Sequence, residues 1–143
     1  MTTEAVILAG MEPRLILMPT SGPGTPPVEV GQGSGEGSGE ALLSGEYLTC
    51  TWNHYSGENG RLYCGIWEST PGKVLINYTE WEFCHLIEGR VVVTSEAGEE
   101  WHLQQGDAFM IPVGFRGTWE TVQTVRKHYV ILMPGPAGPA DNS

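Results

Sequence analysis

The sequence predicts an all-β domain, a sandwich or barrel of short antiparallel strands, with an irregular arm before it. Short segments rich in β-branched and aromatic residues follow one another from residue 46 to residue 133. Turn signals made of Gly, Pro, Asn and Asp separate these segments at short intervals. Of the chain's 20 Gly and 10 Pro, 14 lie in residues 1–45. Short strand-like segments with turns at such regular spacing are typical of β-sandwiches and β-barrels.

The first 45 residues are predicted to form an arm rather than a globular core. They contain a Pro-rich run at 21–27 and the tandem repeat Gly-Ser-Gly-Glu at 33–36 and 37–40. Such segments bury too little apolar surface to fold alone. Two short apolar runs, 5–9 and 15–18, could add strands to the domain or to a partner subunit. The predicted organisation is a Gly/Pro-rich arm over 1–45, a barrel over 46–133 and a flexible tail over 134–143.

The barrel region is expected to contain nine short strands. Their predicted ranges are 47–52, 61–68, 74–79, 82–87, 90–95, 100–104, 108–111, 118–124 and 126–133. Turns are expected between them, among them one at Ala97-Gly98, tight turns at Gly89 and at Gly106-Asp107 and a corner at Gly114. A helix over 118–133 is disfavoured, because seven of these sixteen residues are β-branched and β-branched residues favour strands.

Charge and hydropathy exclude several classes of protein. The chain of 143 residues has 17 acidic and 7 basic side chains and a net charge of −10, which disfavours a nucleic-acid binder. No apolar run approaches the roughly 20 residues that cross a bilayer, and no basic segment leads into an apolar one, so neither a membrane span nor a signal peptide is expected. The three cysteines have no Cys-x-x-Cys spacing. We expect reduced thiols and a cytoplasmic location.

Five blocks of sequence carry a family resemblance. They are Gly-Ile-Trp-Glu-Ser-Thr-Pro-Gly at 65–72, Glu-Phe-Cys-His-Leu-Ile-Glu-Gly at 82–89, Gly-Asp-Ala-Phe-Met-Ile-Pro-Val-Gly at 106–114, and Phe-Arg-Gly-Thr-Trp-Glu at 115–120, followed by Arg-Lys-His-Tyr at 126–129. In this order they resemble the cupin superfamily, and in particular the family named after the (S)-ureidoglycine aminohydrolase cupin domain. The resemblance covers about residues 60–132. It implies a double-stranded β-helix, or jelly-roll barrel, with a ligand cavity inside.

The resemblance also permits a test for a metal site. Metal-binding cupins use two His in a His-x-His, a Glu and a last His, and the matching Glu is Glu82. The His-x-His positions are Ile76 and Tyr78 with a gap of three residues, or Leu75 and Asn77 with a gap of four, and the last position is Gly117. Only Glu82 is certain to be a ligand-type side chain, so we expect no metal and no other cofactor. The histidines, His54, His85, His102 and His128, are not expected to rebuild a site.

Glu82 is the best candidate for a catalytic acid or base. If it faces the barrel interior, burial would perturb its titration; alternatively it pairs with Arg116 or Arg126 and only orders the pocket mouth. Glu80 would share its face on a continuous strand, unless a bulge near Trp81 separates the two. A Cys84–His85 nucleophile is disfavoured, because adjacent strand residues point to opposite faces. Cys84 is expected to be a buried structural thiol whose pKa a neighbouring carboxylate raises.

These observations favour a metal-free small cupin that binds an unidentified small molecule in its barrel. The expected ligand-binding residues are Tyr78, Glu80, Glu82, Arg116 at the mouth and Trp119. The alternative is a metal-dependent enzyme that hydrolyses a ureido compound or a related small amide, as the family name implies. A third reading is an interaction module whose arm joins two subunits, and the resemblance to cupins favours a homodimer.

Overall fold

Antiparallel strands curl into a barrel in the computed structural model, which describes residues 13–21, 29–30 and 41–135. The nine strands of these residues are β1 Glu29–Val30, β2 Ala41–Gly45, β3 Leu48–Gly57, β4 Leu62–Ser69, β5 Gly72–Asn77, β6 Trp81–Ser95, β7 Glu100–Gln104, β8 Ala108–Ile111 and β9 Arg116–Leu132. The described residues contain no helix, and none therefore that could cross a membrane. The all-β prediction is confirmed, and the curled sheet is a jelly-roll fold.

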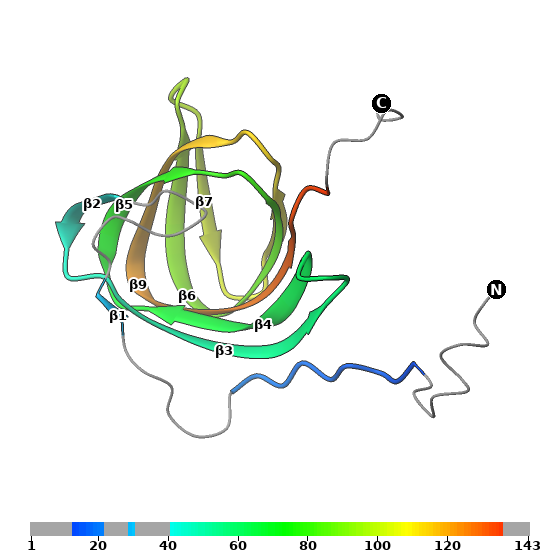
Figure 1. The fold of residues 1–143 in the computed structure, drawn as a ribbon. Coiled ribbons are helices and arrows are strands. Elements are labelled where there is room, and N and C mark those ends of the chain that lie inside the picture. The colour runs from blue at the N-terminus through cyan, green and yellow to red at the C-terminus, as the bar shows by residue number, and fades with distance from the viewer. Residues whose placement is uncertain (1–12, 22–28, 31–40, 136–143) are drawn as a thin grey trace.

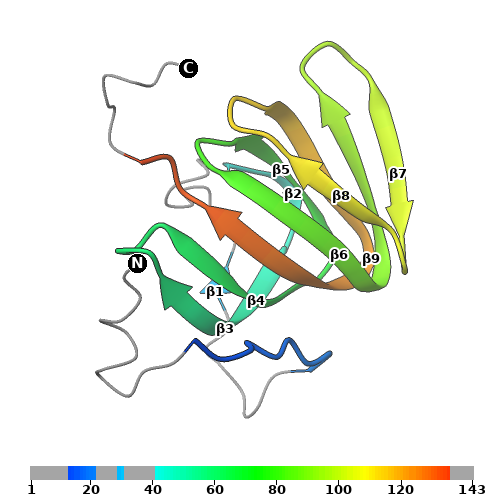
Figure 2. The same ribbon diagram turned by 90° about the vertical axis from the view of Figure 1, so that its right-hand side faces the viewer.

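The two longest strands hold the sheet together. The strand order is β1-β3-β4-β9-β5-β2, and β6 pairs with β9 as well as with β7 and β8. Figure 1 looks into the ring that the strands form, and Figure 2 shows the same barrel from the side, with β6 and β9 running across it. Because β9 pairs with β4, β5 and β6, its inward-facing side chains meet residues from most of the barrel wall.

The prediction of a turn at Gly89 is wrong. Gly89 lies inside β6, which joins the two strands predicted at 82–87 and 90–95, and the predicted strands 118–124 and 126–133 likewise form one strand, β9. Gly89 has φ +97°, and a Cβ there would lie 2.3 Å from the Thr124 carbonyl oxygen. The pairing of β6 with β9 shifts register around this point. Glycine therefore permits a bulge at which β6 bends against β9.

The other predicted turns are where the sequence places them. Gly98 and Gly106 have positive φ in the β6–β7 and β7–β8 connections, and Gly114 has φ +95° between β8 and β9. The Asp107 N–H donates to the Gln104 carbonyl oxygen over 2.9 Å. These short connections leave β7 and β8 as neighbours of β6 on one side of the barrel.

The described parts of the arm add two edge strands to the sheet and one extended segment, 13–21, on the outside of the barrel. The apolar run 15–18 is extended but forms no strand, and the run 5–9 lies outside the described residues. β1 pairs with β3, and β2, which lies in the segment predicted to be arm, pairs with β5. The His128 Nε2 lies 2.9 Å from the Pro19 carbonyl oxygen and attaches the segment 13–21 to β9.

The core fills the inside of the barrel at the end occupied by β5, β6 and β9. Its central side chains are fully buried, Leu86, Val91 and Val125 among them, and Trp119 packs with them at 2% exposure. They all lie on inward-facing positions of β6 and β9. On β9 these positions follow the period of two of a strand, whereas on β6 they change from even to odd numbers across the bulge at Gly89, so that Leu86 and Val91 both face inward. The core closes one part of the barrel and leaves a cavity in the other.

Candidate functional site

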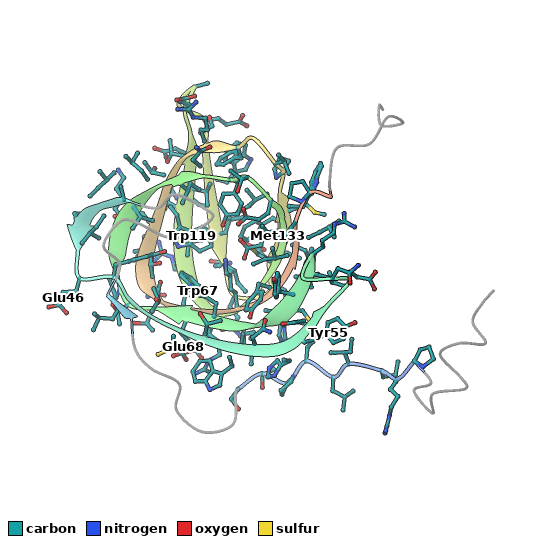
Figure 3. The ribbon with its side chains drawn as sticks, viewed as in Figure 1. Glu46, Tyr55, Trp67, Glu68, Trp119 and Met133 are labelled. Atoms are coloured by element: carbon teal, nitrogen blue, oxygen red, sulfur yellow. The ribbon has the colours of Figure 1, made fainter. Side chains whose placement is uncertain are left out.

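A cavity of about 440 Å³ lies inside the barrel. It is lined by the inward faces of five strands, β3, β4, β5, β6 and β9, and by the residues that lead into β3 and β6. Thr51 and Asn53 on β3 are exposed and line the cavity, so they mark where it opens to solvent. In Figure 3 the labelled side chains of Trp67 and Trp119 lie within the ring of strands. The lining residues are Tyr47, Thr51, Asn53, Tyr63, Trp67, Ile76, Tyr78, Glu80, Glu82, Trp119, Lys127, Tyr129 and Ile131.

A buried ion pair lies in this cavity. The Lys127 Nζ on β9 is 2.8 Å from the Glu82 Oε2 on β6, and the side chains are 5% and 6% exposed. The Tyr78 hydroxyl donates to the other oxygen, Glu82 Oε1, over 2.6 Å. Both oxygens of Glu82 therefore have a donor, as a buried carboxylate requires.

The Lys127 ammonium has aromatic neighbours on two sides. It lies 4.6 Å from the ring centre of Trp67 and 4.5 Å from that of Trp119, within the range of cation–π attraction. Its Nζ is also 3.5 Å from the Cys84 sulfur. Lys127 reaches this position because it is opposite Trp67 in the pairing of β4 with β9, so both side chains point inward.

These contacts keep Lys127 charged. Burial alone would lower the pKa of its ammonium, but the neighbouring Cys84 and Glu82 outweigh burial, and the pKa is raised. Burial, and after it the neighbouring Glu82, raises the pKa of the Cys84 thiol, so the thiol stays protonated and uncharged near neutral pH. Glu82 is therefore the charged partner of Lys127 at that pH. The prediction that a carboxylate raises this thiol pKa is confirmed.

Glu80 is the second carboxylate of the cavity. It is 6% exposed and lies in a bend just before β6, so it lines the same cavity as Glu82 without belonging to that strand. Its Oε1 accepts hydrogen bonds from the Thr79 N–H, over 3.2 Å, and from the Thr79 hydroxyl, over 2.9 Å. All seven Lys and Arg of the chain and all four His lie in the described ranges, and none of them forms an ion pair with Glu80.

Tyrosines surround the remaining space. The Tyr129 hydroxyl donates to the Asn53 Oδ1 over 2.7 Å, which ties the cavity wall on β9 to its open side on β3. Burial is the main cause that raises the pKa of Tyr129, so its hydroxyl stays protonated. The cavity thus combines a few fixed polar groups with aromatic walls, the usual composition of a small-molecule site.

The structure brings together four of the five side chains predicted to bind a ligand. Tyr78, Glu80, Glu82 and Trp119 line the one cavity. Arg116 does not; its side chain is 60% exposed and its Nε lies 3.7 Å from the Glu96 Oε2 outside the cavity.

The alternative in which an arginine pairs with Glu82 is corrected as well. The Nε of Arg126 donates to Glu68 over 2.7 Å, and Lys127 takes the place next to Glu82. An arginine at 126 points away from the cavity because it is next to Lys127 on the strand, and neighbours on a strand face opposite sides.

The positions that hold a metal in other cupins do not fit a metal here. Ile76 and Tyr78 line the cavity with Glu82, whereas Leu75 and Asn77 are exposed. Ile76 and Tyr78 are therefore the positions that correspond to the His-x-His of metal-binding cupins, with three residues between Tyr78 and Glu82. Isoleucine offers no donor, and Tyr78 donates its hydroxyl proton to Glu82. At Gly117 a Cβ would lie 1.9 Å from the Thr94 carbonyl oxygen, so no side chain fits. Within the described ranges, no three His, Cys, Asp or Glu are grouped to hold an ion.

The histidines lie outside the cavity. His85 and His128 stack on the outer face of β6 and β9 with their Nδ1 atoms 3.1 Å apart. His102 is exposed beside Glu100. The expectation that no three imidazoles meet agrees with this arrangement of the described residues.

Sequence reasoning missed Lys127. A signal was present: Lys127 shares the odd positions of β9 with Trp119, which was predicted to face inward, so the period of two places it inside. It was overlooked because lysine is rarely buried unless it is paired, and its partner lies 45 positions earlier on another strand.

The comparisons with known proteins agree with the barrel, which has the fold of a cupin. Residues 56–129 match the EutQ-like cupin domain, and the chain belongs to this family. No curated protein matches the chain. The narrower prediction, the ureidoglycine aminohydrolase cupin family, is not confirmed.

Solved structures share the fold. The EutQ protein of Clostridium difficile is 20% identical with a TM-score of 0.54, and the alignment covers 61% of this chain and 69% of that one. A protein of unknown function from Pseudomonas syringae pv. tomato, described as a member of the DUF861 family, is 25% identical with a TM-score of 0.61 over 73% of this chain and 43% of that one. Ectoine synthase from P. lautus is 15% identical with a TM-score of 0.55 over 66% of this chain and 70% of that one.

Proposed function

We propose that this cupin binds a small molecule in its barrel without a metal ion. One observation supports the proposal above the others: the Lys127 ammonium lies 2.8 Å from Glu82, the residue that matches the metal-binding Glu of other cupins. A protein cation thus neutralises the carboxylate that a metal would otherwise neutralise. Two aromatic faces and the Cys84 sulfur complete its surroundings.

The site is suited to binding more than to acid–base chemistry at Glu82. A general base takes a proton from the substrate, whereas Glu82 is held at both oxygens by buried partners, the Tyr78 hydroxyl and the Lys127 ammonium. We therefore propose that Glu82 orients the Tyr78 hydroxyl and the Lys127 ammonium, and that a ligand lies between them and the aromatic walls. A cavity of about 440 Å³ is within the usual range for small-molecule sites. The metal-dependent hydrolase remains the less supported alternative.

Ligand-observed NMR with a library of small polar compounds tests this function. Thr51 lies at the opening of the cavity, so Thr51→Trp should fill it and abolish the saturation-transfer signals of compounds that bind the wild type. Thr124→Trp, at an exposed position of β9 that does not line the cavity, is the matched control and should leave those signals unchanged. Binding that survives Thr51→Trp would contradict the proposal, and so would the absence of any bound compound.

We also propose that the protein is a cytoplasmic homodimer joined through its arm. The three cysteines are free, as in a reducing compartment. In segment 13–21, Leu15 and Leu17 are 90% and 78% exposed, although the segment is attached to β9 at His128. Light scattering should give about twice the 15.5 kDa chain mass for the full chain and the monomer mass after deletion of residues 1–40. A dimer that survives the deletion would exclude the arm as the joining element.

A further inference from the structure

The charges inside the cavity do not balance. Glu80 and Glu82 line it together with a single basic residue, Lys127. Lys127 is committed to Glu82, so the carboxylate of Glu80 has no counter-ion among the chain's Lys, Arg and His, all of which the structure describes. A carboxylate that is 6% exposed is costly to leave without an opposite charge.

Glu80 has room to accept more donors. The hydrogen bonds it accepts from Thr79 both go to Oε1. An ionised carboxylate can accept about four hydrogen bonds. Glu80 lines the cavity, so a donor that enters there can reach it without displacing Thr79.

The charged groups of the cavity also argue against an anionic or a neutral ligand. An anionic ligand would meet two carboxylates, and the ammonium that could attract it already has Glu82, Cys84 and two indole faces around it. A neutral ligand would leave the charge of Glu80 uncompensated. Aromatic rings elsewhere on the wall, those of Tyr47, Tyr63 and Tyr129, suit the apolar body of an organic cation.

We propose that the cavity binds a small organic cation, with a primary ammonium, amidinium or guanidinium group that is recognised by Glu80. This inference rests on the proposed small-molecule function and adds to it the charge class of the ligand. The cation would donate charge-assisted hydrogen bonds to Glu80, and its body would lie against the tyrosines and below the opening at Thr51 and Asn53.

Three small molecules of similar shape and different charge test the inference on the wild-type protein. The probes are benzamidine, benzamide and benzoate, titrated separately into ¹⁵N-labelled full-length protein. Salt of about 0.15 M screens attraction to the acidic surface. Benzamidine is expected to shift signals of cavity residues with a Kd at least about tenfold below the Kd of benzamide, and benzoate to bind more weakly still. Benzamide or benzoate that binds as tightly as benzamidine would overturn the inference.

Two matched variants show whether Glu80 is the residue that recognises the cation. Glu80→Gln keeps the shape and removes the charge, so the preference for benzamidine over benzamide should fall to within about threefold while benzamide still binds. Glu96→Gln removes an exposed carboxylate outside the cavity and should keep the wild-type preference. A preference that survives Glu80→Gln would assign the cation to another group and overturn the inference.

The outcomes separate this inference from the proposed function. If neutral or anionic probes bind in the cavity and benzamidine binds no more tightly than they do, the proposed small-molecule function stands and the preference for a cation is rejected. No shift of any cavity signal with any probe, in the wild type, would count against both. If Glu80→Gln does not give the near-ultraviolet circular dichroism of the folded protein, the wild-type charge series decides alone.

Discussion

Lys127 is the residue on which the site depends most. Its ammonium replaces a metal ion as the neutralising charge of Glu82, and the two come from different strands, β9 and β6. A buried ion pair of this kind is weak support for overall stability, but the loss of one partner is costly because the other is left buried and charged. Lys127 and Glu82 should therefore behave as a unit.

Lys127→Met tests that coupling. The substitution keeps most of the side-chain volume and removes the charge, so the free energy of unfolding in urea should fall by about 3–5 kcal/mol. Adding Glu82→Gln to it should recover part of the loss, because the unpaired carboxylate is then gone. Arg116→Met breaks an exposed pair with Glu96 and should cost less than about 1 kcal/mol. Equal losses for Lys127→Met and Arg116→Met would contradict the buried pair.

The raised pKa values predict how stability depends on pH. The native protein holds the Cys84 proton above the pH, about 8.5, at which a thiol in the unfolded chain releases it. The unfolded chain is therefore favoured as pH rises past that value, and the free energy of unfolding should fall by up to about 1.4 kcal/mol per pH unit for each proton retained. The raised pKa of Lys127 acts in the same direction at higher pH, because its contribution is complete below about 10.4 and is lost as pH rises through its native pKa.

Urea titrations at several pH values between 7.5 and 10 measure this dependence. Cys84→Ala removes one of the retained protons and should make the fall above about pH 8.5 less steep. A variant as steep as the wild type would show that Cys84 titrates normally in the folded protein.

At the level of elements, β6 and β9 carry both the fold and the site. Glu82 and Cys84 lie on β6, and Trp119, Lys127 and Tyr129 lie on β9. The sequence indicates where strand-forming residues occur but not that two of the strands are continuous. Gly89 normally signals a turn, and only the close approach of β9 shows that it is a bulge in a single strand.

Gly89→Ala and Gly98→Ala form a matched pair that tests this bulge. Both glycines have φ +97°, so alanine carries the same backbone cost, about 1–2 kcal/mol, at each. A Cβ at Gly98 meets nothing within 4 Å, whereas one at Gly89 meets the Thr124 carbonyl oxygen at 2.3 Å. Gly89→Ala should lower the free energy of unfolding by at least about 2 kcal/mol more than Gly98→Ala. Equal effects would mean that β9 does not approach β6 so closely.

For the whole molecule, strand-forming segments and turn spacing were enough to predict an all-β sandwich or barrel, and the resemblance to cupins predicted the jelly roll and pointed to four cavity residues. Tyr78, Glu80, Glu82 and Trp119 follow from their positions on strands and in motifs. The partner of Glu82 does not, because pairing across β6 and β9 depends on register and on the bulge at Gly89. Arg116 was misplaced for the related reason that residue type says little about which face of a barrel a charge occupies.

The central claim is that Lys127, and not a metal ion, neutralises the carboxylate of Glu82 inside this cupin. The direct measurement is the metal content, by inductively coupled plasma mass spectrometry, of protein expressed with added manganese, iron, nickel and zinc and purified without chelator. We predict far less than one equivalent of each metal, because Ile76, Tyr78 and Gly117 supply no metal-binding set beside Glu82. One equivalent of any of these metals, lost in Glu82→Gln, would contradict the claim.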